Sequence, residues 1–255
     1  MPDRENRFKL RQIALVAREL APVERALAAV FGTRVAFRDP AVGKYGLENI
    51  VMPFGNQFLE VVAPVRPDTT AGRYLDRRGG DGGYMVILQC ADPRDRDARV
   101  EALGIRRVGT IDYDDYDGLQ LHPRDTGGSF LEIDWAPGFD RADGDWHPAG
   151  PDWRAARRPD SVAGIAAAEI QSPEPAALAA RWGRLLGGDG SRDIRLEHGA
   201  IRFVDAADGR GEGLGGVDLL VPDPRPILDR AEALGLPVTG NRLLLAGMRF
   251  TLLSP

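Results

Sequence analysis

The fold follows from two segments, Arg11-Gln12-Ile13-Ala14-Leu15-Val16 and Phe58-Leu59-Glu60-Val61, and from their near copies, Tyr84-Met85-Val86-Ile87-Leu88-Gln89 and Phe130-Leu131-Glu132-Ile133. The interval between the two segments is nearly the same in both copies, because 60 − 12 = 48 and 132 − 85 = 47. Self-similarity at a fixed interval indicates an architecture built by repeating one supersecondary unit. The repeat therefore predicts the fold before any single element is considered.

Each copy reads as a strand, a helix and three further strands. Residues 8–65 give a strand, an Ala-rich helix over 23–31 and short strands at 35–37, 48–53 and 57–63. Residues 82–136 give the same order, with a helix that opens at Asp92-Pro93 and ends at Gly104, which are typical start and stop residues. Shortened copies are predicted over 161–206 and 214–255, because a strand, then Asp or Ser with Pro, then a helix ending in Leu-Gly recurs there.

The predicted fold class is α+β, with four βαβββ units forming two domains. The first domain is predicted over 1–136, a linker over 137–160 and a second, degenerate domain over 161–255. The linker is rich in Pro, Gly, Asp and Trp and has no hydrophobic period. Its tryptophans are expected to pack onto a domain surface, with a ligand-facing role as the alternative.

Composition excludes several classes of protein. A hydrophobic share of 43% and a charged share of 28% are typical of a globular domain, and no apolar run reaches the roughly 18 residues of a membrane span. The net charge of −5 argues against a nucleic-acid partner. The charged start of the chain has no apolar signal core, and a single cysteine, Cys90, fits a reducing compartment. We therefore expect a cytoplasmic protein without membrane contact.

Two further stretches resemble a known superfamily. Leu121-His122-Pro123-Arg124-Asp125-Thr126-Gly127-Gly128-Ser129-Phe130-Leu131-Glu132-Ile133 is similar to the closing strand pair of a glyoxalase-type unit, and Gly46-Leu47-Glu48-Asn49-Ile50 with Phe58-Leu59-Glu60-Val61-Val62 resembles the corresponding part. With its tandem βαβββ units, the chain resembles the vicinal oxygen chelate superfamily of glyoxalases, epimerases, extradiol dioxygenases and antibiotic-resistance proteins. The resemblance implies two glyoxalase-like domains with curled mixed sheets, each around a cleft.

In that superfamily the metal ligands come from the first and last strands of each unit, and these positions carry Gln12, Glu60, Met85 and Glu132 here. The resemblance thus implies one divalent ion, Mg²⁺, Mn²⁺ or similar, held by Gln12, Glu60 and Glu132. The usual histidines are absent, and amide oxygen and thioether are weaker ligands. This departure argues against a dioxygenase and against a zinc site of His and Glu.

The resemblance implies a lyase or an isomerase of the epimerase type. Glu60 and Glu132 would transfer a proton on a small carbonyl or carboxylate compound, and Phe58, Met85, His122 and Phe130 would bind it. The alternative is a metal-free protein that binds a small molecule without catalysis, and a third reading is a regulatory pseudoenzyme. Each glutamate could instead be a strand carboxylate with a local partner, and His122 a turn residue. A small-molecule ligand is the expected partner, and a homodimer is left open.

The second half offers arginines where metal ligands would lie. Its last strands carry Arg202 and Arg249, so we expect this half to be a structural or regulatory partner, with anion binding as the alternative. The acidic stretch over 112–117 lacks the spacing of a calcium loop and is expected to be a solvated hairpin.

Overall fold

The computed structural model describes residues 7–254, which form four successive repeats of strands and helices. The first repeat consists of β1 (Lys9–Val16), α1 (Leu20–Phe31), the 3-10 helix η2 (Pro40–Tyr45), β2 (Leu47–Phe54) and β3 (Gln57–Pro64), followed by α2 (Thr70–Arg78). The second consists of β4 (Gly82–Gln89), η3 (Pro93–Arg96), α3 (Asp97–Ala102), β5 (Arg107–Tyr113), β6 (Tyr116–Leu121) and β7 (Phe130–Trp135). The order predicted from the sequence is thus present in the second repeat, and the first repeat lacks one of its three closing strands.

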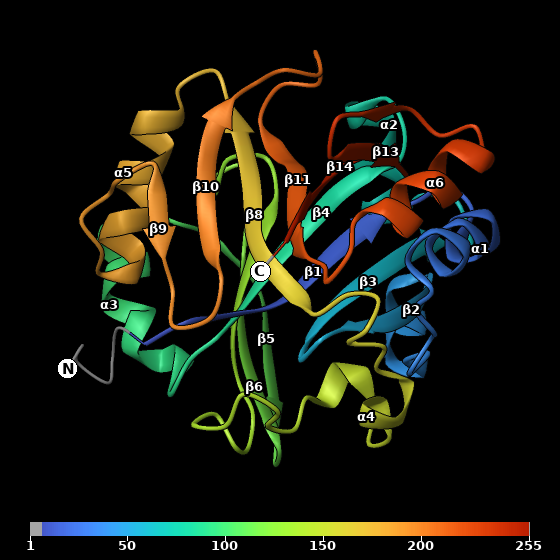
Figure 1. The fold of residues 1–255 in the computed structure, drawn as a ribbon. Coiled ribbons are helices and arrows are strands. Elements are labelled where there is room, and N and C mark those ends of the chain that lie inside the picture. The colour runs from blue at the N-terminus through green and yellow to red at the C-terminus, as the bar shows by residue number, and fades with distance from the viewer. Residues whose placement is uncertain (1–6, 255) are drawn as a thin grey trace. The chain divides into compact units, whose positions relative to one another are not determined.

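The connecting segment carries only η4 (His147–Ala149) and α4 (Trp153–Ala156). The third repeat consists of β8 (Gly164–Ser172), α5 (Pro175–Leu186), β9 (Asp193–Arg195) and β10 (Ala200–Asp205). The fourth consists of β11 (Gly213–Leu220), α6 (Arg225–Ala233), β12 (Val238–Thr239), β13 (Arg242–Leu245) and β14 (Met248–Leu253). Figure 1 shows these elements along the chain.

The strands form two seven-stranded sheets, in the orders β2-β3-β1-β4-β7-β6-β5 and β12-β13-β14-β11-β8-β10-β9. Both sheets are mixed. In the first, β4 and β7 are parallel whereas β6 and β7 are antiparallel, and in the second β11 and β14 are parallel whereas β13 and β14 are antiparallel. The parallel pair joins the first and last strands of a repeat. The α+β class and the tandem glyoxalase-like fold predicted from the sequence are confirmed.

One predicted strand is wrong. The segment 35–37 forms a single bridge between Phe37 and Val51 in place of a strand, so the first repeat has one strand fewer than expected. The chain turns immediately afterwards into η2, where the Asp39 side chain accepts a hydrogen bond from Ala41 N. Pro40 has no N–H to donate to a neighbouring strand. A capped turn therefore replaces the continuation of the strand.

Two helices also differ from expectation. The predicted helix from Asp92 to Leu103 is divided into the turn η3 and the short helix α3. The helix α2 was not predicted, because its sequence is mostly polar and shows little apolar period. The Thr69 side chain caps it by accepting a hydrogen bond from Gly72 N at 2.9 Å. Capping, more than burial, marks the start of this helix.

The chain divides into two compact units, which we call unit 1 and unit 2. Unit 1 comprises residues 7–12, Tyr84–His147 and Ala167–Leu214, and unit 2 comprises Ile13–Gly83, Pro148–Ala166 and 215–254. Unit 1 therefore contains most of the second and third repeats, and unit 2 most of the first and fourth. The domains predicted over 1–136 and 161–255 pair the first repeat with the second and the third repeat with the fourth. This pairing stays a proposal.

Apolar packing between repeats holds unit 2 together. Figure 1 shows α1 and α6 side by side, and Arg230 Nε donates to Val30 O at 2.8 Å. The Phe31 ring lies 5.1 Å from that of Phe250 and 5.4 Å from that of Phe54. Burial of three aromatic side chains of this size is a large stabilising contribution. The first and fourth repeats thus share one core.

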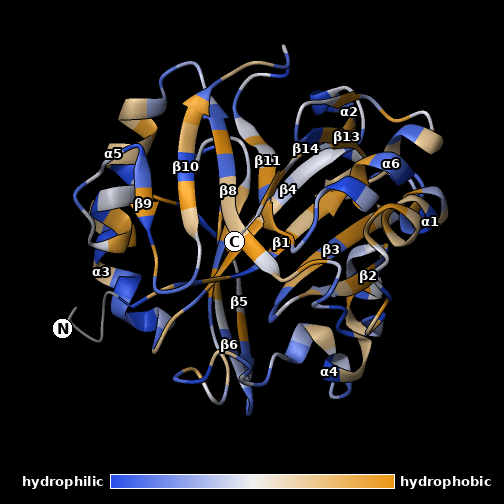
Figure 2. Cartoon of the chain, viewed as in Figure 1, coloured by the Kyte–Doolittle hydropathy of each residue, from blue (hydrophilic) through white to orange (hydrophobic). Residues whose placement is uncertain are grey.

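Unit 1 is held in the same manner by contacts between the second and third repeats. Trp182 is buried in α5 and donates through Nε1 to Thr126 O at 3.2 Å, and the neighbouring Arg181 Nε donates to Asp125 O at 2.8 Å. Figure 2 shows hydrophobic colours along many strands and hydrophilic colours on most connecting loops. Within residues 7–254, no helix is both long enough and apolar enough to cross a membrane.

Candidate functional site

Most of the predicted site residues of unit 1 lie on one face of the sheet, on the strands β4, β6 and β7. The register of β4, β6 and β7 defines this face, since directly paired residues point to the same side. The pairs are Met85 with Phe130, Ile87 with Glu132, Gln120 with Glu132, and Gly118 with Asp134. Met85, Phe130 and Glu132 therefore lie on one face, as the sequence predicted. We call it the carboxylate face.

Glu132 occupies the middle of the carboxylate face and is 5% exposed. Its Oε2 accepts a hydrogen bond from Gln120 Nε2 at 2.7 Å. Burial raises the pKa of Glu132, and hydrogen bonds from Asp134 and Gln120 partly oppose that rise. Burial thus favours the protonated form of this carboxyl group, whereas its hydrogen-bond donors favour the ionised form.

Asp134 lies two residues further along β7 and is fully buried. The Tyr116 hydroxyl donates to its Oδ2. Burial raises the pKa of Asp134 well above its ordinary value, and the charge of Glu132 raises it further. Burial and the charge of Glu132 thus favour the protonated form of Asp134. The two groups form a carboxyl–carboxylate pair that titrates jointly.

The space for this pair depends on a glycine. A Cβ placed on Gly118 would overlap Asp134 Oδ1 and would also lie 3.3 Å from Ile111 Cδ1. Gly118 faces Asp134 directly across β6 and β7. Any side chain here would displace the Asp134 carboxyl group. Glycine at position 118 therefore provides the space that Asp134 and the neighbouring Glu132 occupy.

The connecting segment covers part of the same unit through Trp146. This side chain is 1% exposed, donates from Nε1 to Gln12 Oε1 at 2.7 Å and meets the Tyr116 ring edge-on at 5.3 Å. The neighbouring His147 ring stacks on Tyr116 at 5.6 Å and lies 3.3 Å from Asp115. The prediction that linker tryptophans pack onto a domain surface is confirmed for Trp146.

Unit 2 contains the other two predicted residues, Phe58 and Glu60, on alternate positions of β3. Glu60 is 8% exposed, and its Oε1 accepts a hydrogen bond from Asn49 Nδ2 at 2.7 Å. The Phe58 ring meets the Trp153 ring edge-on at 5.0 Å. A second linker tryptophan thus packs on the strand that carries the second glutamate, and each predicted glutamate has an amide donor inside its own unit.

His122 is a turn residue in this structure. Its Nδ1 accepts from Arg124 N at 3.1 Å, and its carbonyl oxygen accepts from Thr126 Oγ1 at 3.1 Å. The turn is fixed further by Asp125, whose carboxylate accepts two bonds from the Arg106 side chain at 2.8 and 2.9 Å. These bonds lower the pKa of Asp125 to about 2. These contacts correspond to the alternative in which His122 is a turn residue. Its predicted contact with a ligand stays a prediction.

The residues present do not fit a tightly held divalent ion. Among the described residues, no group of three or more His, Cys, Asp or Glu side chains could hold a metal. Gln12 Oε1 already accepts from Trp146, and Glu132 Oε2 already accepts from Gln120 Nε2. A hard cation needs several ionised or carbonyl oxygens that converge. The proton transfer proposed for this site therefore involves no metal ion.

Arg202, one of the two arginines predicted in the second half of the chain, forms an ion pair with a buried carboxylate. Arg202 Nη2 donates to Glu169 Oε1 at 2.9 Å, and the two residues are paired across the parallel strands β8 and β10. Glu169 is 5% exposed. The buried carboxylate balances the guanidinium charge, which favours a structural role for Arg202 over anion binding.

Sequence reasoning missed the residues that surround Glu132. Asp134 lies on the same face by strand alternation, but nothing local to it indicates a partner. Gln120 and Tyr116 become neighbours of β7 only through the register of a hairpin. The signal that was available is the alternate spacing of Tyr116, Gly118 and Gln120, which places all three on one face of a strand, although the sequence analysis assigned Tyr116 to a solvated hairpin over 112–117.

Comparison with known proteins supports the family assignment. The model of a glyoxalase-like domain family matches residues 12–186. This range covers more than half of the chain, including the first two repeats, the connecting segment and part of the third repeat. A search of curated proteins gave no match.

Several solved structures are similar to about half of this chain. A variant of methylmalonyl-CoA epimerase from Streptomyces coelicolor, in complex with 2-nitronate-propionyl-CoA, is 19% identical and covers 50% of this chain and 96% of its own, with a TM-score of 0.43. Methylmalonyl-CoA epimerase from Mycobacterium tuberculosis is 17% identical, covering 50% and 87%, with a TM-score of 0.44. A hypothetical protein from Bacillus halodurans is 15% identical, covering 50% and 94%, with a TM-score of 0.45. Likeness at this level transfers no activity to the present chain.

Proposed function

Because the chain belongs to the glyoxalase-like domain family, we propose that it transfers a proton on a small carbonyl or carboxylate compound, as a lyase or isomerase, with Glu132 as the acting base. The observation that carries the proposal is the buried pair of Glu132 and Asp134. A pair of carboxyl groups whose surroundings separate their roles is a recurrent arrangement for acid–base chemistry. The other contacts on the carboxylate face determine which of the two carboxyl groups acts as the base.

In the proposed reaction, Glu132 removes the proton next to the substrate carbonyl, and the C–H electron pair moves into an enolate. Asp134, whose pKa is raised well above its ordinary value by burial and by the charge of Glu132, keeps its own proton and leaves Glu132 as the ionised member of the pair. The Gln120 amide, 2.7 Å from Glu132, is the nearest neutral donor for the enolate oxygen. Return of the proton from Glu132 to a neighbouring atom gives an isomer, whereas return to the original carbon gives back the substrate, and either regenerates the Glu132 carboxylate.

Met85 and Phe130 supply the apolar part of the proposed site. They are paired on the carboxylate face and are 8% and 7% exposed. An apolar wall beside a carboxylate excludes water and maintains the raised pKa of the base. Glu60 as second catalytic carboxylate, with Phe58 and His122 as binding residues, belongs to the same proposal. A cytoplasmic location and a homodimer complete it, and each needs its own test.

The experiment follows exchange of the α-proton for deuterium in D₂O by NMR, using small 2-oxo acids and malonate half-esters. We expect exchange with at least one compound, and a loss of roughly 10² to 10⁴-fold in Glu132→Gln, the usual contribution of a positioned base. Glu174→Gln, a change at an exposed glutamate of the same unit, is the matched control and should keep the wild-type rate. Equal rates in wild type and Glu132→Gln would disprove the proposal.

A second candidate is a protein that binds a small molecule without turning it over. It is favoured by the contacts of Trp146. The ring of Trp146 covers Gln12 and Tyr116, so both of these residues are already hydrogen-bonded or packed and are not available as catalytic groups. The same compounds distinguish the two candidates. Saturable stabilisation of the protein by a compound that shows no α-proton exchange would select binding over catalysis.

A further inference from the structure

Glu132, the proposed base, is 5% exposed, and Asp134 beside it is fully buried. A substrate must bring its reacting carbon into contact with the Glu132 carboxylate, and a bound small molecule usually has most of its surface covered by protein. Part of unit 1 therefore has to move before a substrate can reach Glu132. The best candidate is the segment between β7 and η4, residues 138–146, which carries no helix or strand and which we call the covering loop.

Trp146, at the end of the covering loop, contacts two strands that are not neighbours. Its Nε1 donates to Gln12 Oε1 on β1 at 2.7 Å, and its ring meets the Tyr116 ring on β6 edge-on at 5.3 Å. In the sheet order, β4 and β7 lie between β1 and β6, which corresponds to roughly 14 Å in a flat sheet at the usual strand spacing. One indole reaches both strands because the sheet curls around it. Trp146 therefore fills the concave side of the sheet at the Tyr116 end of the carboxylate face.

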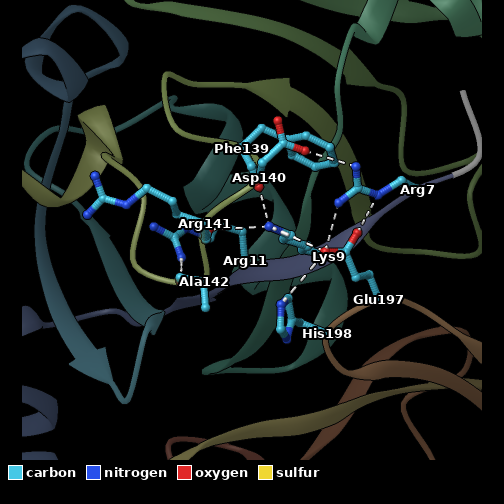
Figure 3. A network of polar contacts seen from close by, with 9 residues as sticks. All are labelled: Arg7, Lys9, Arg11, Phe139, Asp140, Arg141, Ala142, Glu197 and His198. Carbon is cyan, nitrogen blue, oxygen red and sulfur yellow. Dashed lines mark hydrogen bonds and ion pairs between the residues drawn. The ribbon is translucent and has the colours of Figure 1, made fainter. Parts of the chain in front are cut away.

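The rest of the covering loop is held by two side chains of β1 (Figure 3). Lys9 Nζ donates to Phe139 O, and Arg11 Nη1 donates to Ala142 O at 3.0 Å. These bonds join side chains to main-chain carbonyl groups, and no strand ladder includes the loop in the described part of the chain. A segment without ladder hydrogen bonds opens at a lower free energy than the strands beside it.

The covering loop is closed on itself. Gly138 has a φ of 75°, Arg141 N donates to Gly138 O at 2.8 Å, and a Cβ on Gly144 would overlap Gly138 O. The two ends of the stretch 138–144 are thus in contact, as in a compact surface loop. A loop of this kind can move as one body, because its internal contacts do not depend on the sheet.

His147 fastens the end of the covering loop at the protein surface. Its ring stacks on the Tyr113 ring at 5.3 Å and on the Tyr116 ring at 5.6 Å, and its Nδ1 lies 3.3 Å from Asp115. The side chains of His147 and Asp115 are 41% and 64% exposed, and ion pairs at such exposure contribute little. The buried contacts of Trp146 are therefore a principal attachment of the loop.

We infer that the covering loop is a lid, closed in this structure, and that a substrate enters the space that the Trp146 indole leaves when the loop opens. Closure keeps water away from Tyr116 and from Asp134, to which the Tyr116 hydroxyl donates. The use of the lid for substrate entry rests on the proposed proton transfer. The opening itself rests only on the contacts of Trp146 and of the loop.

The opening is tested by hydrogen exchange of indole N–H groups, followed by NMR of the full chain in D₂O with urea below the unfolding transition. Trp146 and Trp182 are matched reporters in unit 1, because both are 1% exposed and both donate through Nε1, Trp182 to Thr126 O at 3.2 Å. We expect the Trp146 N–H to exchange at least about tenfold faster, with little dependence on urea, because the opening exposes little surface. Equal rates with equal urea dependence would overturn the inference, since Trp146 would then be a permanent part of the core.

Two variants separate local opening from unfolding. Phe203→Leu removes the ring that meets Trp182 at 5.5 Å, and it should accelerate exchange at Trp182 and leave Trp146 unchanged. Gln12→Met removes the acceptor of the Trp146 N–H and should accelerate its exchange about tenfold, the effect of one lost buried hydrogen bond. Equal acceleration of both indoles by Phe203→Leu would contradict a lid. If a variant does not fold, the comparison of the two indoles in the wild type still decides the question.

Nitration by tetranitromethane, measured by mass spectrometry, tests whether the opening uncovers the carboxylate face. Tyr116 is 2% exposed, and Tyr74, which is 1% exposed and donates to Gly83 O, is the matched control. We expect nitration of Tyr116 to rise about tenfold in Gln12→Met, in step with the opening, and that of Tyr74 to stay unchanged. Unchanged nitration of Tyr116 in a variant whose Trp146 N–H exchanges faster would overturn the inference. Neither measurement uses a substrate, so a failure of the proposed proton transfer is distinguishable from a failure of the lid.

Discussion

The indole nitrogen of Trp146 donates a hydrogen bond of 2.7 Å to Gln12 Oε1, and both residues are about 99% buried, with 1% of each side chain exposed. Gln12 is a position that the superfamily resemblance assigns to a metal ligand. A residue of the connecting segment thus satisfies the oxygen that a metal would have needed. Several consequences of this contact and of the neighbouring carboxyl pair can be measured.

The hydrogen bond between Trp146 and Gln12 should be visible as an interaction free energy. Trp146→Phe keeps a ring beside Tyr116 but loses the donor, and Gln12→Met keeps the length of the side chain but loses the acceptor. We expect each single variant to lower the free energy of unfolding by about 1–3 kcal/mol, because it leaves a buried polar group unpaired. The double-mutant cycle, from urea unfolding, should give a coupling of about 1 kcal/mol. Strictly additive effects would contradict it.

The stability of the protein should decrease as the pH rises above the ordinary carboxyl values, 3.8 for Asp and 4.5 for Glu. The folded state raises the pKa of Asp134 and of Glu132, so it binds more protons than the unfolded state in this window. Stability from these groups is complete below the unfolded values and is lost as the pH passes through the raised folded values. Each proton contributes a slope of up to about 1.4 kcal/mol per pH unit.

Asp134→Asn isolates this effect, because asparagine has the same shape but no titrating group. Urea unfolding between pH 4 and pH 8 should show a shallower decline for this variant than for the wild type. Asp160→Asn, at an exposed position in the connecting segment, should follow the wild-type curve. Parallel curves for wild type and Asp134→Asn would show that the buried carboxyl group does not hold its proton in the folded state.

The fold could be predicted largely from the sequence, whereas the partners on the carboxylate face could not. Repeated strand and helix patterns are local and survive in each copy, so the four repeats were apparent. The strand expected at 35–37 failed because Pro40 and the Asp39 cap favour a turn, a local signal that the apolar pattern concealed. The partner of Gln12 lies 134 residues away in the sequence, and no pattern within one repeat indicates it.

Gly118 should be intolerant of a side chain. A Cβ there would overlap the Asp134 carboxyl group, so Gly118→Ala forces the aspartate or the strand to shift. We expect a loss of about 1–3 kcal/mol in the free energy of unfolding, the usual effect of overpacking in a dense interior. Gly188→Ala, where a Cβ would meet no atom within 4 Å, is the control and should stay within about 0.5 kcal/mol of the wild type. A neutral Gly118→Ala would mean that the carboxyl pair has room to move.

Metal content provides the remaining test of the superfamily's usual chemistry in this chain. The oxygen of Gln12 is engaged by Trp146, and the Glu132 carboxylate is engaged by Gln120 and Asp134, so a divalent ion would have to break buried hydrogen bonds before it could bind. We therefore expect less than stoichiometric metal by mass spectrometry of the purified protein after dialysis against Mn²⁺, Ni²⁺ or Zn²⁺, with no difference between wild type and Glu132→Ala. One ion per chain that is lost in Glu132→Ala would instead show that these side chains rearrange to hold a metal, and the proton transfer would then have to be rewritten with that ion stabilising the enolate.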